Sequence, residues 1–164
     1  MKCRKCGAGA VIELPRHNAA FCAPDFQEFF RKQIAEAIRK HSMFTTDEPV
    51  LVAVSGGKDS LALWDVLIES GYQTAGLYLD LGIFDYSVES KARCETFAAS
   101  RGQKLLVESV AERVGAGIPE VQKATRRPTC SACGLSKRYL MNRAAVDHGY
   151  PVVATGHNLD DEAA

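Results

Sequence analysis

Hydrophobic and polar positions divide the 164-residue chain into three regions. Residues 1–24 have no long apolar run and are punctuated by turn-forming glycines and prolines. In residues 25–40, apolar side chains recur at the spacing of one helix face, at Phe26, Phe29, Phe30, Ile34, Ala37 and Ile38. We therefore predict a small module at 1–24, followed by a connecting helix and linker at 25–48.

From Pro49 onward, short apolar runs alternate with amphipathic segments that end in glycine. The pattern predicts strands at 50–54, 73–79, 104–108 and 152–155, and helices at 60–70, 87–101 and 131–147. Continuous apolar strands that alternate with helices indicate a parallel sheet covered by helices on both faces. Residues 49–164 are thus predicted to form an α/β domain. Because another helix is expected to begin near Ala164, we expect the domain to continue beyond it.

Charge and composition limit the function classes. The 20 basic and 20 acidic residues give a formal net charge of zero, so nucleic-acid binding would have to come from local patches. No apolar run approaches the ~18 residues that cross a bilayer, and the N-terminus lacks the apolar segment of a signal peptide. We expect a cytoplasmic protein without membrane contact. Because thiols stay reduced in the cytoplasm, we expect the six cysteines to serve as metal or redox ligands rather than as a disulfide framework.

The segment Ser55–Ser60, with the sequence SGGKDS, directly follows the first strand of the α/β domain. Glycines let the backbone approach phosphate oxygens, the next helix points its first N–H groups at them, and Lys58 adds positive charge. A Walker A loop is excluded, because its first glycine would fall at Val52 and its Ser/Thr at Asp59. Asp59 is predicted to be the N-cap of the next helix, to lie near phosphate or Mg²⁺, or both.

Two further loops are expected at the same edge of the sheet. Leu79 and Asp80 end the second strand of the domain, and Gly156 and His157 follow the fourth. Open α/β sheets bind ligands at the carboxyl ends of their strands. Beyond them, the pair Asp160–Asp161 opens the next expected helix. Acidic residues there commonly cap the helix, and two adjacent carboxylates can also hold Mg²⁺ or act on a substrate.

The first cysteines have the spacing of a zinc ribbon, with Cys3 and Cys6 on one knuckle and Cys22 about 15 residues later. A structural zinc ion takes four ligands, and both Asp25 and His17 are candidates for the fourth. A segment of 24 residues cannot bury a sufficient core of its own, so metal is the expected source of its stability. The alternative is a tail with free thiols.

A second cysteine pair, Cys130 and Cys133, stands at the entry to a predicted helix. Helix N–H groups and neighbouring cations favour the thiolate form there, and Lys137 shares a helix face with Cys133. The surrounding run has no acidic residue between 123 and 143 but contains Lys123, Arg126, Arg127, Lys137, Arg138 and Arg143. This run is either a phosphate-contacting patch or solvated surface. Cys94 is expected to be a buried apolar residue.

SGGKDS and TGHNLDDEA (155–163) match the two characteristic segments of the PP-loop ATP pyrophosphatases. Together with the N-terminal cysteine module, DLGIFDYS (80–87) and PTCSACGLSKRYLMNR (128–143), they make the whole chain resemble the TtuA-type tRNA 2-thiouridine synthetases. These enzymes are relatives of the TtcA-type cytidine thiolases and of the eukaryotic tRNA 2-thiolation enzymes. The resemblance implies a Rossmann-like sheet of the adenine nucleotide alpha hydrolase type, preceded by a zinc ribbon.

The resemblance also implies an activity: ATP adenylates the C2 oxygen of a tRNA uridine, and sulfur then replaces it. The implied ATP site consists of Ala53, Val54, Ser55, Gly56, Gly57, Lys58, Asp59, Ser60, Leu79, Asp80, Gly156 and His157. The resemblance implies that Cys130 and Cys133 take part in catalysis, and Lys137 and Asp161 are further catalytic candidates by position. Asp160 and Asp161 are also candidate ligands of Mg²⁺.

In that family Cys130 and Cys133 would hold a [4Fe–4S] cluster, together with a third cysteine from later in the chain. Expected partners are tRNA, a ubiquitin-like sulfur carrier protein and a second copy of the chain. Three other readings stay open: cytidine 2-thiolation, adenylation of a small metabolite, and a non-catalytic zinc- and nucleotide-binding protein.

Overall fold

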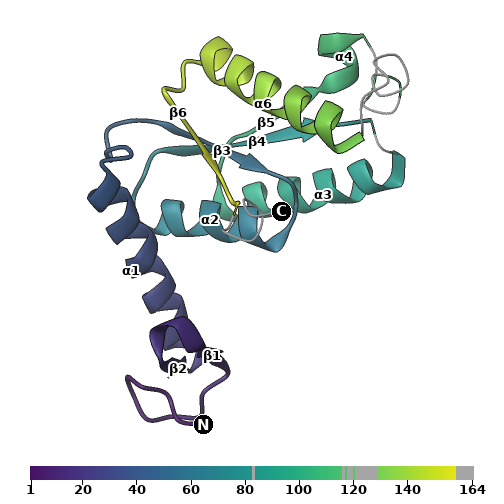
Figure 1. The fold of residues 1–164 in the computed structure, drawn as a ribbon. Coiled ribbons are helices and arrows are strands. Elements are labelled where there is room, and N and C mark those ends of the chain that lie inside the picture. Colours follow the sequence, from purple (N-terminus) through teal and green to yellow (C-terminus); the bar gives the residue numbers. More distant parts are fainter. Residues whose placement is uncertain (83, 116, 118–119, 121–128, 158–164) are drawn as a thin grey trace. The chain divides into compact units, whose positions relative to one another are not determined.

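The computed structural model describes residues 1–82, 84–115, 117, 120 and 129–157. The chain forms two compact units, Met1–Phe44 and Thr45–Ala164 (Figure 1). In the first unit, strand β1 (Ile12–Leu14), the 3₁₀ turn η1 (Pro15–His17) and strand β2 (Ala19–Phe21) precede helix α1 (Ala23–His41). The predicted helix at 25–40 is confirmed. The two strands were not predicted, because three residues are too few to show a period.

The core of the first unit is small. β1 and β2 pair antiparallel, with Ile12 opposite Phe21. Phe21 of β2 and Cys3 are buried in one apolar cluster that also includes side chains of β1 and α1. Phe29 of α1 stacks on Phe21, with the ring centroids 5.0 Å apart. Because stabilisation by burial scales with the apolar area removed from water, so few side chains stabilise the unit only weakly.

The second unit contains a four-stranded parallel sheet in the order β5-β4-β3-β6. Its strands are β3 (Val50–Val54), β4 (Thr74–Asp80), β5 (Leu105–Ser109) and β6 (Val152–Thr155). The central strand β3 pairs with both β4 and β6, and Val50, Leu51 and Val52 are completely buried. The predicted parallel α/β sheet is therefore confirmed.

Helices cover both faces of this sheet (Figure 1). Helices α2 (Lys58–Glu69) and α3 (Phe84–Arg101) lie on one face, α6 (Thr129–His148) lies on the other, and the short α4 (Val110–Val114) follows β5. Trp64 of α2 connects this helix to α3 and to the sheet. Its ring packs on Phe97 of α3, and its Nε1 donates to Thr74 Oγ1 of β4 at 3.1 Å. On the opposite face, Ala144 and Ala145 of α6 pack on the sheet.

The strand order reverses at β3. The chain moves from β3 to β4 on one side and returns with β6 on the other. Such a reversal opens a crevice at the carboxyl ends of the strands, where open α/β sheets bind ligands. The loop that follows β3 lies at this position.

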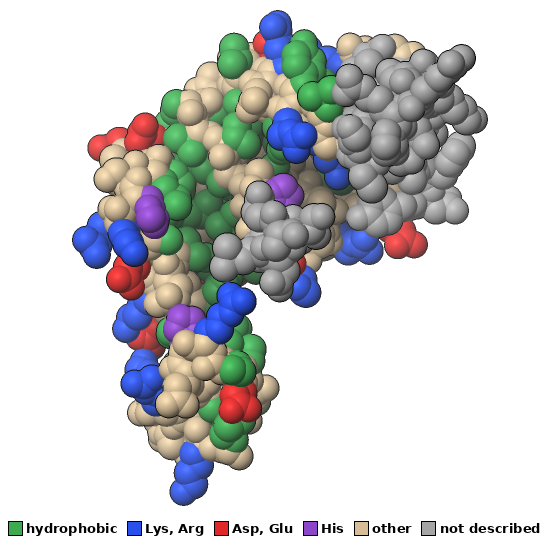
Figure 2. All heavy atoms as spheres, viewed as in Figure 1, with side chains coloured by type: hydrophobic (Ala, Val, Ile, Leu, Met, Phe, Trp, Pro, Cys, Tyr) green, Lys and Arg blue, Asp and Glu red, His purple; other side chains and the backbone are tan. Residues whose placement is uncertain are grey.

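Lys and Arg side chains lie interspersed with Asp and Glu on the face that Figure 2 presents, in keeping with the formal net charge of zero. Among the described residues, no helix combines the length and apolar character that crossing a membrane requires.

Candidate functional site

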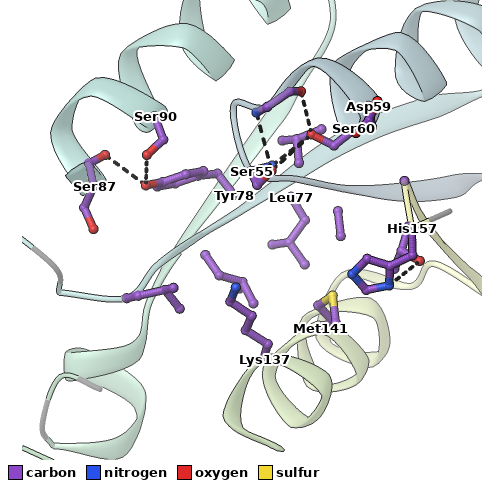
Figure 3. A pocket seen from close by; sticks show the side chains of 17 residues that line it. Ser55, Asp59, Ser60, Leu77, Tyr78, Ser87, Ser90, Lys137, Met141 and His157 are labelled. Carbon is purple, nitrogen blue, oxygen red and sulfur yellow. Dashed lines mark hydrogen bonds between the residues drawn. The ribbon is translucent and has the colours of Figure 1, made fainter. Parts of the chain in front are cut away.

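The loop after β3, here called the phosphate loop (Ser55–Ser60), is held by the hydroxyl of Ser60. Ser60 Oγ donates to the Gly57 carbonyl at 3.1 Å and accepts from the Ser55 backbone N–H at 3.2 Å (Figure 3). Helix α2 has Gly57 as its N-cap, and Asp59 lies in its first turn. The N-cap reading of Asp59 is therefore wrong, because the helix begins earlier than predicted.

The loop after β6 touches the start of α2. A Cβ added to Gly156 would lie 2.8 Å from both the backbone N and the Cα of Ser60. Only glycine allows two backbone segments to approach this closely. The close approach of the two loops brings the start of α2 and the end of β6 to one site.

A cavity of about 300 Å³ opens between the phosphate loop, the end of β4, helix α3 and helix α6. Nine residues of the expected ATP site line it: Ala53, Val54, Ser55, Gly57, Asp59, Ser60, Leu79, Gly156 and His157. Three others do not. Gly56 faces α3, the Lys58 side chain is 88% exposed and pairs with Asp59 at 2.7 Å, and Asp80 accepts from the Gly82 N–H at 2.9 Å.

Sequence reasoning missed several lining residues: Leu77, Tyr78, Ser87, Ser90 and Met141. Tyr78 carries the clearest signal, because it is a polar aromatic residue between the apolar Leu77 and Leu79. Its hydroxyl donates to the Ser87 carbonyl at 2.9 Å and contacts Ser90 Oγ at 3.5 Å. These contacts join the end of β4 to helix α3.

Helix α6 contributes to the same cavity and carries Cys133 of the second cysteine pair. Lys137 and Met141, four residues apart, line the cavity from this helix, and Lys137 points inward (Figure 3). Cys133, one turn before Lys137, is half-buried against a cluster that contains Leu81, and Leu79 also packs there. Leu79 and Leu81 are themselves cavity-lining residues. Cys133 therefore shares one apolar cluster with two cavity-lining residues.

Several predicted site residues lie wholly or in part outside the residues that the structure describes. Cys130 belongs to the first turn of α6, but its side chain is not described. The pair Asp160–Asp161 and the basic residues Lys123, Arg126 and Arg127 also lie outside the described residues. Of the remaining basic run, Arg138 is exposed and Arg143 pairs with Asp147 at 3.0 Å.

The first unit gathers four metal-ligating side chains. Ligand atoms of Cys3, Cys6, Cys22 and Asp25 lie within 4.8 Å of one another. The thiols of Cys3 and Cys22 contact Asp25 Oδ2 at 3.0 and 3.2 Å, and the sulfurs of Cys6 and Cys22 are 3.6 Å apart. Thiol hydrogen bonds, first that of Cys6, hold the pKa of Asp25 well below its usual range.

The other candidate for the fourth ligand, His17, is not among these four residues. Its ring meets Phe29 edge-on, with the centroids 5.1 Å apart. Asp25 is brought to the thiols because α1 begins at Ala23, one residue after Cys22, which puts position 25 in the first helical turn. Its second oxygen, Oδ1, lies 3.6 Å from Lys5 Nζ. Lys5 is in turn paired with Glu28.

A parallel sheet with a glycine loop at its point of reversal defines the α/β nucleotide-binding class. Comparison with known proteins identifies the family. The chain belongs to the PP-loop family, whose domain model matches residues 26–164. Residues 2–27 match the N-terminal LIM domain of the 2-thiouridine synthetase TtuA. The resemblance predicted from the motifs is confirmed.

The chain is 52% identical over its full length to the tRNA-5-methyluridine(54) 2-sulfurtransferase of Thermus thermophilus and 43% identical to that of Pyrococcus horikoshii. It spans about half of these relatives, 51% and 52% of their lengths. Among solved structures it is similar to the U34-tRNA thiolase NcsA of Methanococcus maripaludis, which contains a [4Fe-4S] cluster. That similarity has a TM-score of 0.85 at 26% identity and covers 98% of this chain and 55% of the other.

Proposed function

We propose that this chain is the ATP-binding portion of a tRNA 2-sulfurtransferase that converts a tRNA uridine into 2-thiouridine. One observation carries the proposal: the helix that bears the Cys130–Cys133 pair also supplies Lys137 and Met141 to the cavity beside the phosphate loop. The preferred substrate is 5-methyluridine 54, which the names of the 52% and 43% identical relatives specify. The 26% identical thiolase acts on uridine 34.

In the first step the phosphate loop holds the β and γ phosphates of ATP. The uridine C2 oxygen attacks the α-phosphorus, the bond to the β-phosphate bridging oxygen breaks, and pyrophosphate leaves. Backbone N–H groups at the start of α2 stabilise the charge on the departing group. Mg²⁺ would be held by Asp160 and Asp161, and Asp161 would take the N3 proton of the uridine as the C2 oxygen is adenylated.

In the second step sulfur attacks C2, the C2–O bond breaks, and AMP leaves with the former uridine oxygen. Lys137 points into the cavity, where its ammonium group would stabilise the negative charge on the departing AMP phosphate. The attacking sulfur would be hydrosulfide, its binding site would be the one that Cys130 and Cys133 form, and its proton would pass to N3 of the uridine.

The donor set of α6 fits an iron–sulfur cluster. Cysteine thiolates are the usual ligands of such clusters, and the half-buried Cys133 lies among apolar side chains beside the cavity. Cys130 and Cys133 would hold the cluster with a third cysteine. When bound, it would supply an iron site for the incoming sulfur.

The N-terminal group of ligands fits zinc. Tetrahedral zinc with Zn–S bonds of about 2.3 Å separates two sulfur ligands by about 3.8 Å, and Cys6 and Cys22 are 3.6 Å apart. Three thiolates and one oxygen of Asp25 would complete the four ligands of a structural site. Its role would be to stabilise the first unit.

The remaining assignments follow from family membership. Exposed Arg138 and the basic residues before α6 would contact tRNA phosphates. A ubiquitin-like carrier protein would supply sulfur, and the enzyme would act as a cytoplasmic homodimer.

The test is sulfur transfer by the whole protein. The purified enzyme, reconstituted without oxygen, is incubated with tRNA, ATP, Mg²⁺ and sulfide, and the nucleosides are separated by mass spectrometry. We expect an oxygen-to-sulfur exchange in 5-methyluridine. Thiolated cytidine, or AMP formation that does not need tRNA, would instead indicate one of the other PP-loop activities.

A variant separates the two steps. Cys130→Ala should abolish thiolation and leave ATP binding unchanged. Loss of ATP binding in this variant would contradict the assignment of phosphate binding and sulfur transfer to different elements.

A further inference from the structure

The phosphate loop lies against the backbone of helix α3. Gly56 has φ +74°, and a Cβ added to it would lie 2.6 Å from the Ser90 carbonyl oxygen and 3.0 Å from the Ser90 Cα. Backbone atoms cannot move aside as the end of a flexible side chain can. The loop and the helix are therefore in direct backbone contact at this point, and position 56 accepts no side chain.

The next turn of α3 binds the Gly56 carbonyl. Arg93 Nε donates to this oxygen at 3.2 Å. The adjacent Cys94 is completely buried, as expected for a small apolar residue. The peptide group between Gly56 and Gly57 is thus held by a side chain of α3.

This contact matters because the loop contains two adjacent glycines. Glycine loses more conformational freedom on ordering than any other residue, and a loop that binds anions through its amides must hold those amides in one orientation. Order that is already present in the free protein does not have to be supplied by the ligand. Arg93 lies where it can provide that order.

We propose that Arg93 is a positioning residue that holds the phosphate loop in its anion-binding shape. The inference rests on the proposed ATP binding and adds a residue to that site. Arg93 does not line the cavity, so it acts through Gly56.

Charge alone offers a competing explanation for any effect of Arg93. The guanidinium lies 3.6 Å from Glu89 on the same helix, and the Arg93 side chain is 51% exposed. Solvent and Glu89 therefore screen its field at the nucleotide. If Arg93 acts through loop geometry, phosphate affinity should depend on its hydrogen bond to Gly56 and not on its charge.

The experiment measures the affinity of the whole protein for ATP, pyrophosphate and adenosine by calorimetry. Arg93→Ala should weaken ATP and pyrophosphate binding about tenfold, as expected for the loss of one charge-assisted hydrogen bond. Adenosine affinity should not change, because adenosine does not need the loop amides. Arg93→Lys, which retains the charge, should lose nearly as much.

Lys91→Ala is the matched control. It removes the same charge from the same helix, where Lys91 pairs with Glu95 at 3.7 Å, and it should leave all three affinities unchanged. Unchanged ATP affinity in Arg93→Ala would overturn the inference, and so would an equal loss for adenosine or full rescue by Arg93→Lys. If the wild-type protein binds neither ATP nor pyrophosphate, it is the proposed function that fails.

Discussion

The two units of the chain build their sites in opposite ways. In the first unit the site consists of side chains, three thiols and one carboxylate, around which few apolar residues are buried. In the second, the phosphate loop offers backbone groups, and a sheet with completely buried residues in its central strand supports it. We therefore expect the first unit to depend on a bound metal for its stability, and the second to hold its loop in place without a ligand.

Removing the metal should have the largest effect and should be confined to one unit. Structural zinc contributes about 10 kcal/mol or more to the folding of small zinc modules, so Cys22→Ser or a strong chelator should unfold residues 1–44. Hydrogen exchange would show lost protection in β2 and retained protection in β3. Protected amides in a metal-free β2 would contradict the dependence on metal.

Gly156→Ala tests the close approach in the second unit. The new methyl group would lie 2.8 Å from the Ser60 backbone, and such overpacking costs about 1–3 kcal/mol of unfolding free energy. Denaturant unfolding should show this loss, together with weaker ATP binding. Gly134→Ala is the control, because its Cβ would meet only the flexible end of Arg138, at 3.6 Å. Equal behaviour of the two variants would show that the loops are not tightly packed.

Lys5 should tune the metal site. Its Nζ lies 3.6 Å from Asp25 Oδ1 while Oδ2 faces the thiols, so it orients the carboxylate. Residues in this position typically change metal affinity 10- to 100-fold, and we expect about a tenfold loss in Lys5→Ala by chelator competition. Lys32→Ala is the control, since Lys32 also pairs with Glu28, at 2.9 Å, whereas Lys5 pairs with both Glu28 and Asp25. An equal loss in both variants would point to general surface charge.

The smallest predicted effect is on how the unfolding free energy depends on pH. Hydrogen bonds from Arg113, and to a lesser degree from His148, lower the pKa of Glu108 in the folded protein. The unfolded chain then takes up the proton first as the pH falls. The stabilisation is present above about pH 4.3, the ordinary glutamate value, and it is lost as the pH falls through the folded-state pKa.

Glu108→Gln should remove this part of the acid sensitivity. The difference should stay below about 1 kcal/mol, because the Arg113 partner is partly exposed. Unfolding free energies of wild type and variant, measured between neutral and acid pH, check the prediction. If the unfolding free energies of wild type and variant fall equally with pH, the Glu108 pairing does not contribute to acid sensitivity.

Local patterns predicted the second unit better than the first. The apolar run of β3 and the strand β6 were predicted with their observed bounds, because buried parallel strands are continuous apolar segments. The spacing of the cysteines could not choose between Asp25 and His17, since only the start of α1 decides which side chain reaches the thiols.

Contacts between secondary-structure elements could not be predicted from the sequence either. Ser87, Ser90 and Arg93 read as ordinary helix positions, and their contacts with Tyr78 and Gly56 arise from the way α3 packs beside the phosphate loop. Lys137 was predicted because its spacing from Cys133 places both on one helix face. Its position in the cavity depends on the packing of α6 on the sheet.

The proposed function requires that nucleotide and sulfur meet in one cavity. A crystal structure of the whole protein with a non-hydrolysable ATP analogue tests this directly. We predict the terminal phosphates on the backbone of Ser55–Ser60, with the α-phosphate in the cavity that Lys137 enters and Cys133 adjoins. A triphosphate bound elsewhere, or cysteines 130 and 133 facing a separate surface, would contradict it.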